Sequence, residues 1–330
     1  MNLGGAIHIN KPGLLLVFIV VALFLFYFFS KSADTSSAIK DEFKDSIDLS
    51  NLLIVAIKAA QNGGNEVLKT KDNLKIDSKG KTGEGINDPV TTADYNSHCA
   101  MEATLKHQYP DISIVSEENK VMCNNSIVYD YSKPNNVKID VMDSIKPNVI
   151  KLEDITIWID PLDATKEFTE KLYQYVTTMV CVAVKGEPII GVIHKPFENK
   201  TYYAWVGKEE RNLKVGSSDG TQTKIVVSIS HRGTIEEVLK KNFKDVKVIT
   251  AAGAGYKVLE VVAGNADAYV HNTVIKKWDI CAGNAILNAI GGRMTTKNNA
   301  VISYFNDGHP VNTDGLIATV KEHDKYVGKI

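Results

Sequence analysis

The stretch WIDPLDATKEFTE, residues 158–170, holds two aspartates, Asp160 and Asp163, with a proline between them. The proline restricts the backbone and favours a turn, which brings both carboxylates to the same side of the chain. Two carboxylates this close repel each other unless a cation lies between them. Mg²⁺ prefers oxygen ligands, often one or two carboxylates together with substrate phosphates. The stretch therefore indicates a magnesium site, although the same letters also suit a simple turn and helix start.

Further acidic residues lie where other elements are expected to begin or end. Glu117 and Glu118 follow the strand predicted in ISIVSEEN, Asp94 closes the polar run DPVTTAD, and Asp279 follows Trp278 at a predicted helix start. In α/β-type folds, ligand sites gather at such ends. A single acidic residue at a helix start more often serves the helix dipole. It is the recurrence of acidic residues at several ends that favours a site.

The elements that would position these residues alternate between helix and strand. Apolar spacing predicts helices over residues 47–68 and 96–109, with a loop over 69–87 between them. A buried strand is predicted to end at Asp160, and antiparallel strands follow it. From residue 224 onward, strands alternate with helices. Mixed α and β without an internal repeat predicts a layered α+β or α/β sandwich.

The N-terminus contains an uncharged apolar run, residues 13–29, that is long enough for a membrane span. The run exceeds a usual signal-peptide core, and aromatic residues stand where a cleavage site would be expected, so a retained signal anchor is favoured over a cleaved peptide. We therefore expect a cytoplasmic tail at 1–12, a transmembrane helix at 13–30, a polar stem at 31–46 and a catalytic domain at 47–330. Flanking lysines are nearly balanced and do not decide the orientation.

The overall composition leaves partners and compartment open. The 38 basic and 39 acidic side chains give no basic bias, so no nucleic-acid partner is indicated. The glycosylation sequons at Asn124 and Asn199 matter only if the domain is lumenal. The cysteines show no metal-ligand spacing, and one or two disulfides compete with buried thiols. They are Cys99, Cys123, Cys181 and Cys281.

Taken together, the motifs resemble the magnesium-dependent, lithium-sensitive phosphatase superfamily that includes inositol monophosphatase, fructose bisphosphatase and 3′-nucleotidases. DPVTTAD, EE, DPLDxT and WD occur in the family order over residues 88–292. Ala164 stands where most of the superfamily has glycine, TKEFTE replaces the ending typical of inositol phosphatases, and a long excursion separates Glu117 from Asp160. These departures favour the nucleotidase branches, above all the Golgi branch that acts on adenosine 3′,5′-bisphosphate (PAP).

The resemblance implies an inositol monophosphatase-like sandwich of alternating helix and sheet layers that binds two or three Mg²⁺ ions. By matching position, Glu117, Asp160 and the carbonyl of Leu162 would hold one ion. Asp160, Asp163 and Asp279 would hold a second.

The resemblance also implies the residues that act on water and on the nucleotide. Asp94 and Thr165 would orient and deprotonate the attacking water. A lysine and a glycine at the substrate make physical sense, as a point charge for phosphate and a place of close backbone approach. The implied nucleotide contacts are Ser228, His231, Gly253 and Lys257.

The function implied is removal of the 3′-phosphate of PAP, giving AMP and phosphate and clearing the by-product of sulfotransferases. The enzyme would be a single-pass Golgi membrane protein with a lumenal, glycosylated catalytic domain, and a homodimer is possible. One alternative keeps the metal site but acts on inositol phosphates. The other is a membrane-tethered nucleotide-binding protein without turnover, which the intact metal and base positions disfavour.

Overall fold

The computed structural model of the 330-residue chain divides into two units, residues 1–46 and residues 47–330. The structure describes residues 19, 21–25, 27, 46–81, 85, 87–118, 123, 148–209, 211–218, 220–229 and 234–330.

The first unit contains the expected tail, anchor and stem. The tail at 1–12 lies outside the described residues, as does the stem at 31–46 apart from Ser46. Within the expected anchor, residues 19, 21–25 and 27 are helical and exposed. A search of the described part of the chain finds no helix with the length and apolar character that a membrane crossing needs. The transmembrane anchor and its orientation therefore stay predictions from the sequence.

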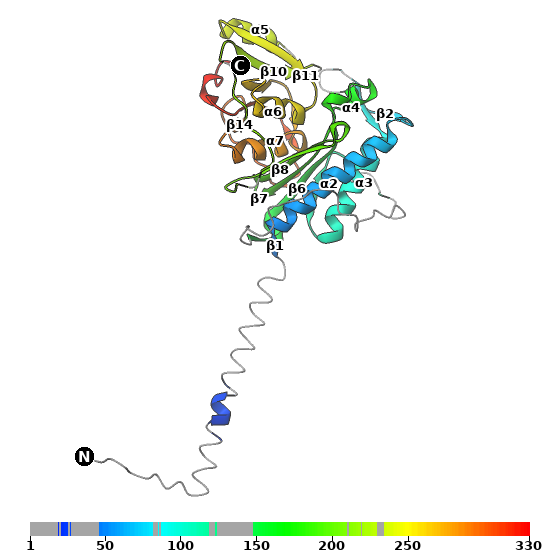
Figure 1. Cartoon of the computed structure of the whole chain (residues 1–330), viewed down its shortest axis with the longest axis vertical. Helices are drawn as coiled ribbons and strands as arrows, with labels where there is room; N and C mark the ends of the chain where they lie inside the picture. The colour runs from blue at the N-terminus through cyan, green and yellow to red at the C-terminus, as the bar shows by residue number, and fades with distance from the viewer. Residues whose placement is uncertain are drawn as a thin grey trace, which may run out of the picture. The chain divides into compact units, whose positions relative to one another are not determined.

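The first layers of the second unit are two helices on one face of a five-stranded sheet (Figure 1). The sheet has the order β4 (Ser113–Ser116), β6 (Ile155–Asp163), β7 (Thr177–Val184), β8 (Glu187–Lys195) and β9 (Lys200–Trp205). The helices are α2 (Leu49–Thr70) and α3 (Thr92–Gln108). Side chains alternate along a strand. Ile157 and Ile159 accordingly join the core under α2 and α3, while Trp158 joins the core on the opposite face.

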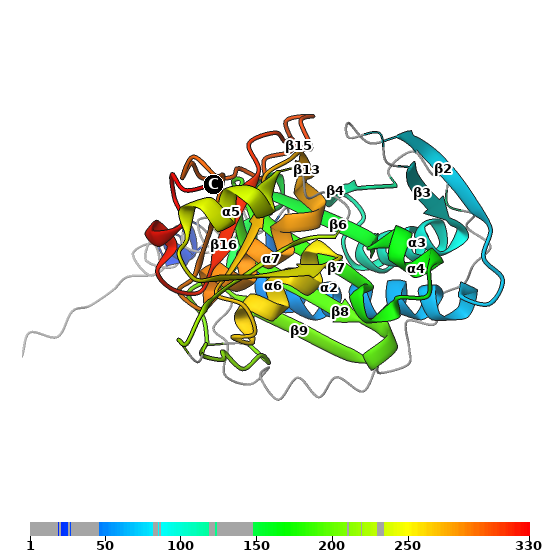
Figure 2. The same ribbon diagram turned by 90° about the horizontal axis from the view of Figure 1, so that it is seen from above.

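The second half of the domain adds a helix layer, a second sheet and an outer helix. The second sheet has the order β11 (Val246–Ala251), β10 (Thr223–Ser228), β12 (Ala268–His271), β16 (Leu316–Thr319) and β14 (Arg293–Thr295). The middle helices α6 (Ala254–Val262) and α7 (Lys277–Ala289) pack between the two sheets (Figure 2), and α5 (Ile235–Asn242) covers the far face. The predicted sandwich of alternating helix and sheet layers is confirmed.

Short elements connect these layers. The strands are β1 (Ser46–Asp48), β2 (Ile76–Lys81), β3 (Asn87–Thr91), β5 (Val149–Lys151), β13 (Ile275–Lys276) and β15 (Val311–Asn312). The short helix α4 (Thr165–Thr169) follows β6, and 3₁₀ turns occupy Leu152–Asp154, Tyr173–Tyr175, Pro196–Glu198 and His323–Lys325.

Three local expectations are corrected by the structure. The loop expected over 69–87 contains β2, which pairs antiparallel with β3. Every residue of β2 is exposed, so the strand lacks the alternation of apolar and polar residues that would have predicted it. Helix α3 begins at Thr92 rather than residue 96, because Thr91 caps it and Asp94 completes a capping box. Strand β6 does not end at Asp160 but continues to Asp163, with a register shift against β7 between the two aspartates.

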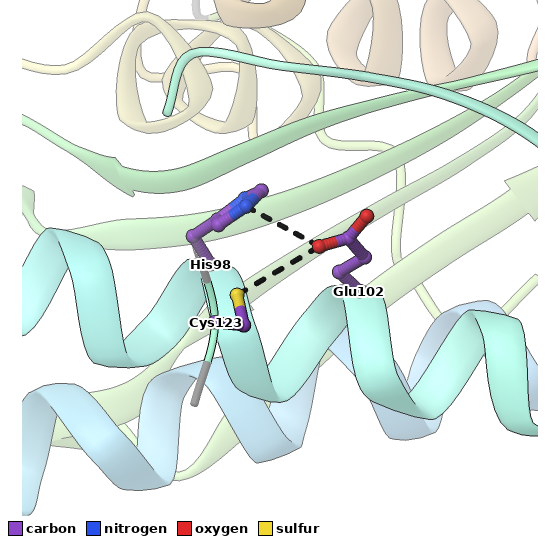
Figure 3. Close-up of side chains that lie close together, drawn as sticks. All are labelled: His98, Glu102 and Cys123. Carbon is purple, nitrogen blue, oxygen red and sulfur yellow. Dashed lines mark hydrogen bonds and ion pairs between the residues drawn. The ribbon is translucent and has the colours of Figure 1, made fainter. Parts of the chain in front are cut away.

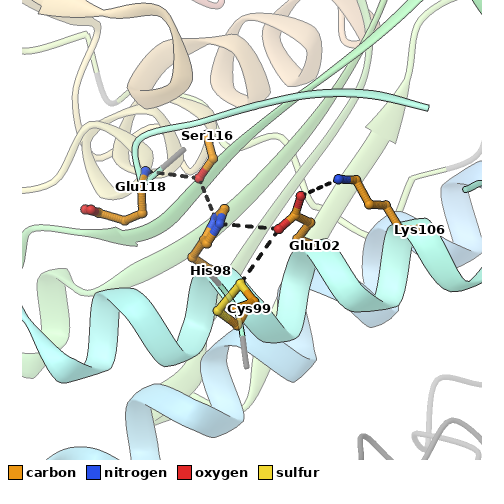
Figure 4. Close-up of a disulfide and its surroundings, with 7 residues drawn as sticks. His98, Cys99, Glu102, Lys106, Ser116 and Glu118 are labelled. Atoms are coloured by element: carbon orange, nitrogen blue, oxygen red, sulfur yellow. Dashed lines mark hydrogen bonds and ion pairs between the residues drawn. A yellow bond between two sulfur atoms is a disulfide. The ribbon is translucent and has the colours of Figure 1, made fainter. Parts of the chain in front are cut away.

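The four cysteines form two disulfides, which resolves the alternatives left open by the sequence. Cys99 of α3 is bonded to Cys123, and Cys181 of β7 is bonded to Cys281 of α7. The first disulfide is drawn with its surroundings in Figure 4. The second joins the first sheet to the helix layer between the sheets, so it lies within the main core.

Candidate active site

The residues expected to act on water, Asp94 and Thr165, meet where two helices begin. The backbone N–H and the hydroxyl of Thr91 both donate to Asp94 Oδ2, at 2.7 and 2.6 Å. Thr165 is the first residue of α4, and its hydroxyl lies 2.9 Å from Asp94 Oδ1 and 3.0 Å from the carbonyl oxygen of Leu162. Burial raises the pKa of Asp94 to about 7, although these hydrogen bonds act in the opposite direction. The hydroxyl of Thr165 therefore connects a buried carboxylate to an expected metal ligand.

A left-handed residue makes the transition from β6 to α4. Ala164 has φ 70° and ψ 44° and precedes the first residue of the helix. An L-residue with a side chain pays roughly 1–2 kcal/mol for this conformation, which glycine adopts freely. Such strain is typical of functional sites, where surrounding contacts hold the backbone in place. Ala164 is the single residue between Asp163, which ends β6, and Thr165, which begins α4.

Asp160 and Asp163 are held in β6 by different partners. Asp160 Oδ1 accepts the nearby backbone N–H of Leu162, at 3.1 Å. Asp163 faces the start of α6: its oxygens accept the backbone N–H groups of Ala254 and Gly255, at 3.1 and 2.8 Å, and Oδ2 also accepts the hydroxyl of Thr177 at 3.1 Å. A helix N-terminus favours an anion. Asp163 is therefore fixed in orientation by the helix layer.

The expected metal ligands form one interacting set of carboxylates. Burial raises the pKa of Asp160 well above its usual range, and the negative charges of Glu117, Asp163 and Asp279 raise it further. Burial and the charges of Glu117 and Asp163 do the same to the pKa of Asp279. Asp160 and Asp163 are almost fully buried. Unpaired charge in such surroundings is costly, so this oxygen-rich set, with the carbonyl of Leu162 at its edge, fits hard divalent cations such as Mg²⁺.

Two lysines from different elements interact with this carboxylate set. Lys79 of β2 lies 2.8 Å from Glu117 Oε1 and also contacts Glu118. Burial alone lowers the pKa of Lys79, but the two glutamates outweigh it and raise the pKa overall. Lys257 of α6 is buried beside Asp163; burial lowers its pKa to about 8, and the nearby carboxylates act against that shift. Lys79 could not be predicted as part of the site, because its place near Glu117 depends on the pairing of β2 with β3.

The expected nucleotide contacts lie partly at one sheet edge. Ser228 ends β10 and Gly253 follows β11, and these two strands are parallel neighbours, so both residues lie at the carboxyl edge. Gly253 has φ 67°, and a Cβ there would lie 2.7 Å from the carbonyl oxygen of Tyr175 and 3.0 Å from Asp163 Oδ2, so only glycine fits. His231 lies outside the described residues. Gly253 and Lys257 thus lie beside Asp163, and Ser228 lies at the same sheet edge as Gly253.

Alternating layers, a buried carboxylate set and an adjacent hydroxyl–carboxylate pair are the features of a metal-dependent phosphatase. The model of the inositol monophosphatase family matches residues 48–328. The chain belongs to the inositol monophosphatase family and is a phosphatase. Members of this family depend on a divalent metal, typically Mg²⁺.

Individual relatives agree with this assignment. The chain is 47% identical over 339 residues to the Drosophila melanogaster protein named "Putative inositol monophosphatase 3", covering 99% of this chain and 95% of that protein. It is 43% identical over 296 residues to the Golgi-resident adenosine 3′,5′-bisphosphate 3′-phosphatase of Mus musculus, covering 86% and 82%. The crystal structure of CysQ from Bacteroides thetaiotaomicron has a TM-score of 0.60 at 22% identity, covering 82% of this chain and 98% of that one, which supports the fold.

Proposed function

We propose that the protein hydrolyses the 3′-phosphate of adenosine 3′,5′-bisphosphate (PAP), giving AMP and phosphate, with Mg²⁺ as cofactor. The observation that carries the proposal is the hydrogen bond from Thr165 to Asp94 beside the buried carboxylates. The mouse relative, whose name states this activity, supports the choice of substrate.

The proposed cofactor is a set of two or three Mg²⁺ ions. Its ligands would be Glu117, Asp160, Asp163, Asp279 and the carbonyl of Leu162. When bound, the ions neutralise the developing charge on the phosphoryl oxygens and hold that group in line for displacement.

The protein's own groups position the attacking water and take up its proton. A water donating to Thr165 Oγ1 allows that hydroxyl to donate in turn to Asp94 Oδ1, 2.9 Å away. Asp94 is suited to accept the proton because its other oxygen is fixed by Thr91 and its pKa is raised by burial to about 7. As the water oxygen bonds to phosphorus, the bond from phosphorus to the 3′-oxygen breaks, and the departing 3′-oxygen takes a proton from solvent to give the 3′-hydroxyl of AMP.

The nucleotide would lie along the edge that carries Ser228 and Gly253. The absence of a side chain at Gly253 leaves backbone room beside Asp163. Lys257, buried beside the same aspartate, supplies a positive charge for phosphate. His231 completes the proposed set.

We also propose that the domain is lumenal in the Golgi, on a single-pass signal anchor at residues 13–30. Two disulfides support an oxidising compartment, because cytosolic thiols are normally kept reduced. Asn199 of the second sequon is exposed at the turn between β8 and β9, whereas Asn124 lies outside the described residues. A homodimer remains a prediction from the resemblance.

The topology has a direct test in cells that express the full chain. If the domain is lumenal, glycosidase treatment increases the electrophoretic mobility of the protein, and Asn124→Gln with Asn199→Gln abolishes the change. Protease added to sealed vesicles spares the domain. Digestion of the domain in intact vesicles would refute a lumenal location.

A second candidate substrate is an inositol phosphate, favoured by the name of the Drosophila relative. Both substrates suit the same carboxylates and the same Asp94–Thr165 pair. The two substrates should differ in their contacts with Ser228 and Gly253, because an inositol phosphate has no nucleoside to lie along that sheet edge.

Phosphate release by the full-length protein in detergent separates these alternatives. PAP and inositol 1-phosphate are compared with and without Mg²⁺, for wild type, Asp163→Ala and the control Asp324→Ala, in which the same change is made at an exposed aspartate. We expect magnesium-dependent release from PAP that Asp163→Ala abolishes and Asp324→Ala preserves. Release from inositol 1-phosphate alone would overturn the substrate, and release from neither would overturn the activity.

A further inference from the structure

A second group of metal-ligating side chains lies on α3, away from the expected magnesium ligands. We call it the α3 cluster; its members are His98, Cys99, Glu102 and Cys123. Three of them occupy one turn of the helix, and the fourth is joined to it by the disulfide Cys99–Cys123 (Figures 3 and 4). No step of the proposed reaction uses any of them.

The spacing of the α3 cluster suits a tetrahedral zinc ion. The ligand atoms of His98, Glu102 and Cys123 all lie within 4.8 Å of one another. Glu102 Oε2 is 3.5 Å from His98 Nε2 and 3.7 Å from Cys123 Sγ. With zinc–ligand bonds of about 2.0–2.3 Å, neighbouring ligand atoms of a tetrahedral site lie about 3.3–3.8 Å apart. The distances around Glu102 therefore already match.

Outer contacts orient two of the ligands. His98 Nδ1 is hydrogen-bonded to Ser116 Oγ at 2.9 Å, which leaves Nε2 facing Glu102. Lys106 lies 2.6 Å from Glu102 Oε1, which leaves Oε2 facing the imidazole and the sulfur. Zinc-binding histidines commonly have their second nitrogen fixed in this way.

The disulfide decides whether the sulfur atoms can bind a metal. Thiolates are the metal-binding form of cysteine, and a disulfide sulfur carries neither the charge nor a proton. A dithiol reductant supplies two electrons and two protons, so that the S–S bond becomes two thiols and the reductant becomes a disulfide. Each thiol then loses its proton on binding zinc. Two thiolates, one carboxylate and Zn²⁺ carry a net charge of minus one, which Lys106 balances.

We propose that the α3 cluster is a redox-gated Zn²⁺ site, closed by the disulfide in the oxidised protein and opened by its reduction. The zinc-bound form belongs to the reduced chain, before oxidation or after exposure to a dithiol. In that form the ion takes the place of the disulfide and holds Cys123 against α3. The reduced chain thus keeps a link at the position where the oxidised chain has a covalent bond.

The test uses the full-length protein in detergent, with Co²⁺ as a spectroscopic probe for zinc. Cobalt bound to thiolates gives an intense charge-transfer absorption that cobalt bound to carboxylates lacks. Excess Mg²⁺ keeps cobalt from the carboxylates of the active site. Mild reduction favours the partly exposed Cys123 over the pair Cys181 and Cys281, both of which are fully buried.

We expect the reduced wild type to bind one Co²⁺ with this absorption, to lose it on addition of Zn²⁺, and to show none of it while oxidised. Cys123→Ser should abolish the absorption. Glu102→Gln keeps every thiol and should weaken binding about tenfold or more. The control Glu237→Gln, an exposed glutamate on α5, should not change it.

Three results would overturn the proposal. The first is a reduced wild type without the charge-transfer absorption. The second is an equal absorption in Cys123→Ser, which would assign the cobalt to Cys181 and Cys281. The third is unchanged affinity in Glu102→Gln, which would remove the carboxylate from the site. Circular dichroism of each variant establishes that it is folded, and phosphatase activity is not needed as a readout.

Discussion

The carboxylates at the two ends of α3 differ in whether nearby positive charges balance them. Asp94, His98, Glu102 and Lys106 follow one another at intervals of four, the spacing of neighbours on a helix face. At the first end, Asp94 is buried with hydroxyl and N–H partners, close enough to Glu117 for repulsion to raise its pKa. At the other, Glu102 has Lys106 on one oxygen and His98 near the other.

This difference separates a site that needs an external cation from one that the chain itself balances. The carboxylates of the active site exceed the charge of Lys79 and Lys257, and burial makes that excess costly. Bound cations would offset the cost. In the oxidised protein, the charge of Glu102 in the α3 cluster is balanced by Lys106, and the disulfide closes the cluster. Similar residues thus differ in whether they need a bound cation, according to what surrounds them.

The largest effect is expected from Asp160→Asn. Phosphate release should fall by roughly 10³-fold, because an electrostatic contact to the transition state is lost. The melting temperature in EDTA should stay level or rise, since the change removes a buried charge that its neighbours repel. Calorimetry should also show that most of the Mg²⁺-induced stabilisation is gone. Full activity, or wild-type stabilisation by Mg²⁺, would show that Asp160 is not a ligand.

The next effect is expected from Thr165→Val, which removes a hydroxyl with little change in shape. The rate should fall by about 10²–10³-fold, within the range for losing a group that transfers a proton, while Mg²⁺ still raises the melting temperature. Thr169→Val removes from the same helix a hydroxyl that donates to the carbonyl of Lys166, and it should retain activity. Equal losses in both variants would point to α4 as a whole rather than to the Thr165 hydroxyl.

Removing the two disulfides should have unequal effects on stability. The sequence separations are 100 residues for Cys181–Cys281 and 24 for Cys99–Cys123. The chain-entropy model gives about 4.7 kcal/mol for the longer loop and about 3.5 kcal/mol for the shorter one. Urea unfolding of the two double-alanine variants measures the difference. If removal of Cys99–Cys123 lowers the free energy of unfolding more than removal of Cys181–Cys281 does, contacts around the α3 cluster contribute more than chain entropy.

The stability of the metal-free protein should fall as pH rises. The pKa of Asp94 is raised from 3.8 to about 7, so the folded state binds its proton more tightly than the unfolded state does. The stabilisation from this proton is complete below about pH 4 and is lost as pH rises through about 7. Between pH 5.5 and pH 8 in EDTA, we expect the melting temperature to fall by roughly 3–6 °C. Asp94→Asn should make the melting temperature depend less on pH. If the melting temperature of the variant falls with pH at least as steeply as that of the wild type, other groups cause the dependence.

The smallest effect is expected from Lys106→Met, at the end of α3 where Lys106 balances the charge of Glu102. The pair with Glu102 spans one helical turn and is partly exposed, so its loss should lower the free energy of unfolding by about 0.3–0.5 kcal/mol. Phosphate release should be unchanged. A loss of activity would show that the two ends of α3 are coupled.

Much of the candidate site could be predicted because its signals are local. Asp160, Asp163 and Thr165 lie within six residues, and a buried β-branched strand leads directly to them. The transmembrane prediction at 13–30 rests on an equally local signal. Only part of that segment is among the described residues, and it remains a prediction.

Other features depended on pairings between distant segments. Lys79 belongs to an exposed strand without apolar alternation, and only its partner strand β3 makes it a strand at all. Helix α3 begins earlier than its apolar periodicity predicts, because its capping residues are polar and the periodicity begins after them. The cysteine pairing could not be read from spacing, because four cysteines allow three connectivities and sequence separations of 24 and 100 do not select one of them.

By itself, the sequence determined the order of the elements, the layered class and the acidic motifs, because these follow from short-range patterns of apolar residues, turns and caps. Only the tertiary structure decided which charges meet. It places Thr165 on Asp94, Lys79 on Glu117 and Cys123 on Cys99, across 71, 38 and 24 residues of sequence. The physical reason is that burial and the distance between charges set the energies of these groups, and both arise only when the layers pack.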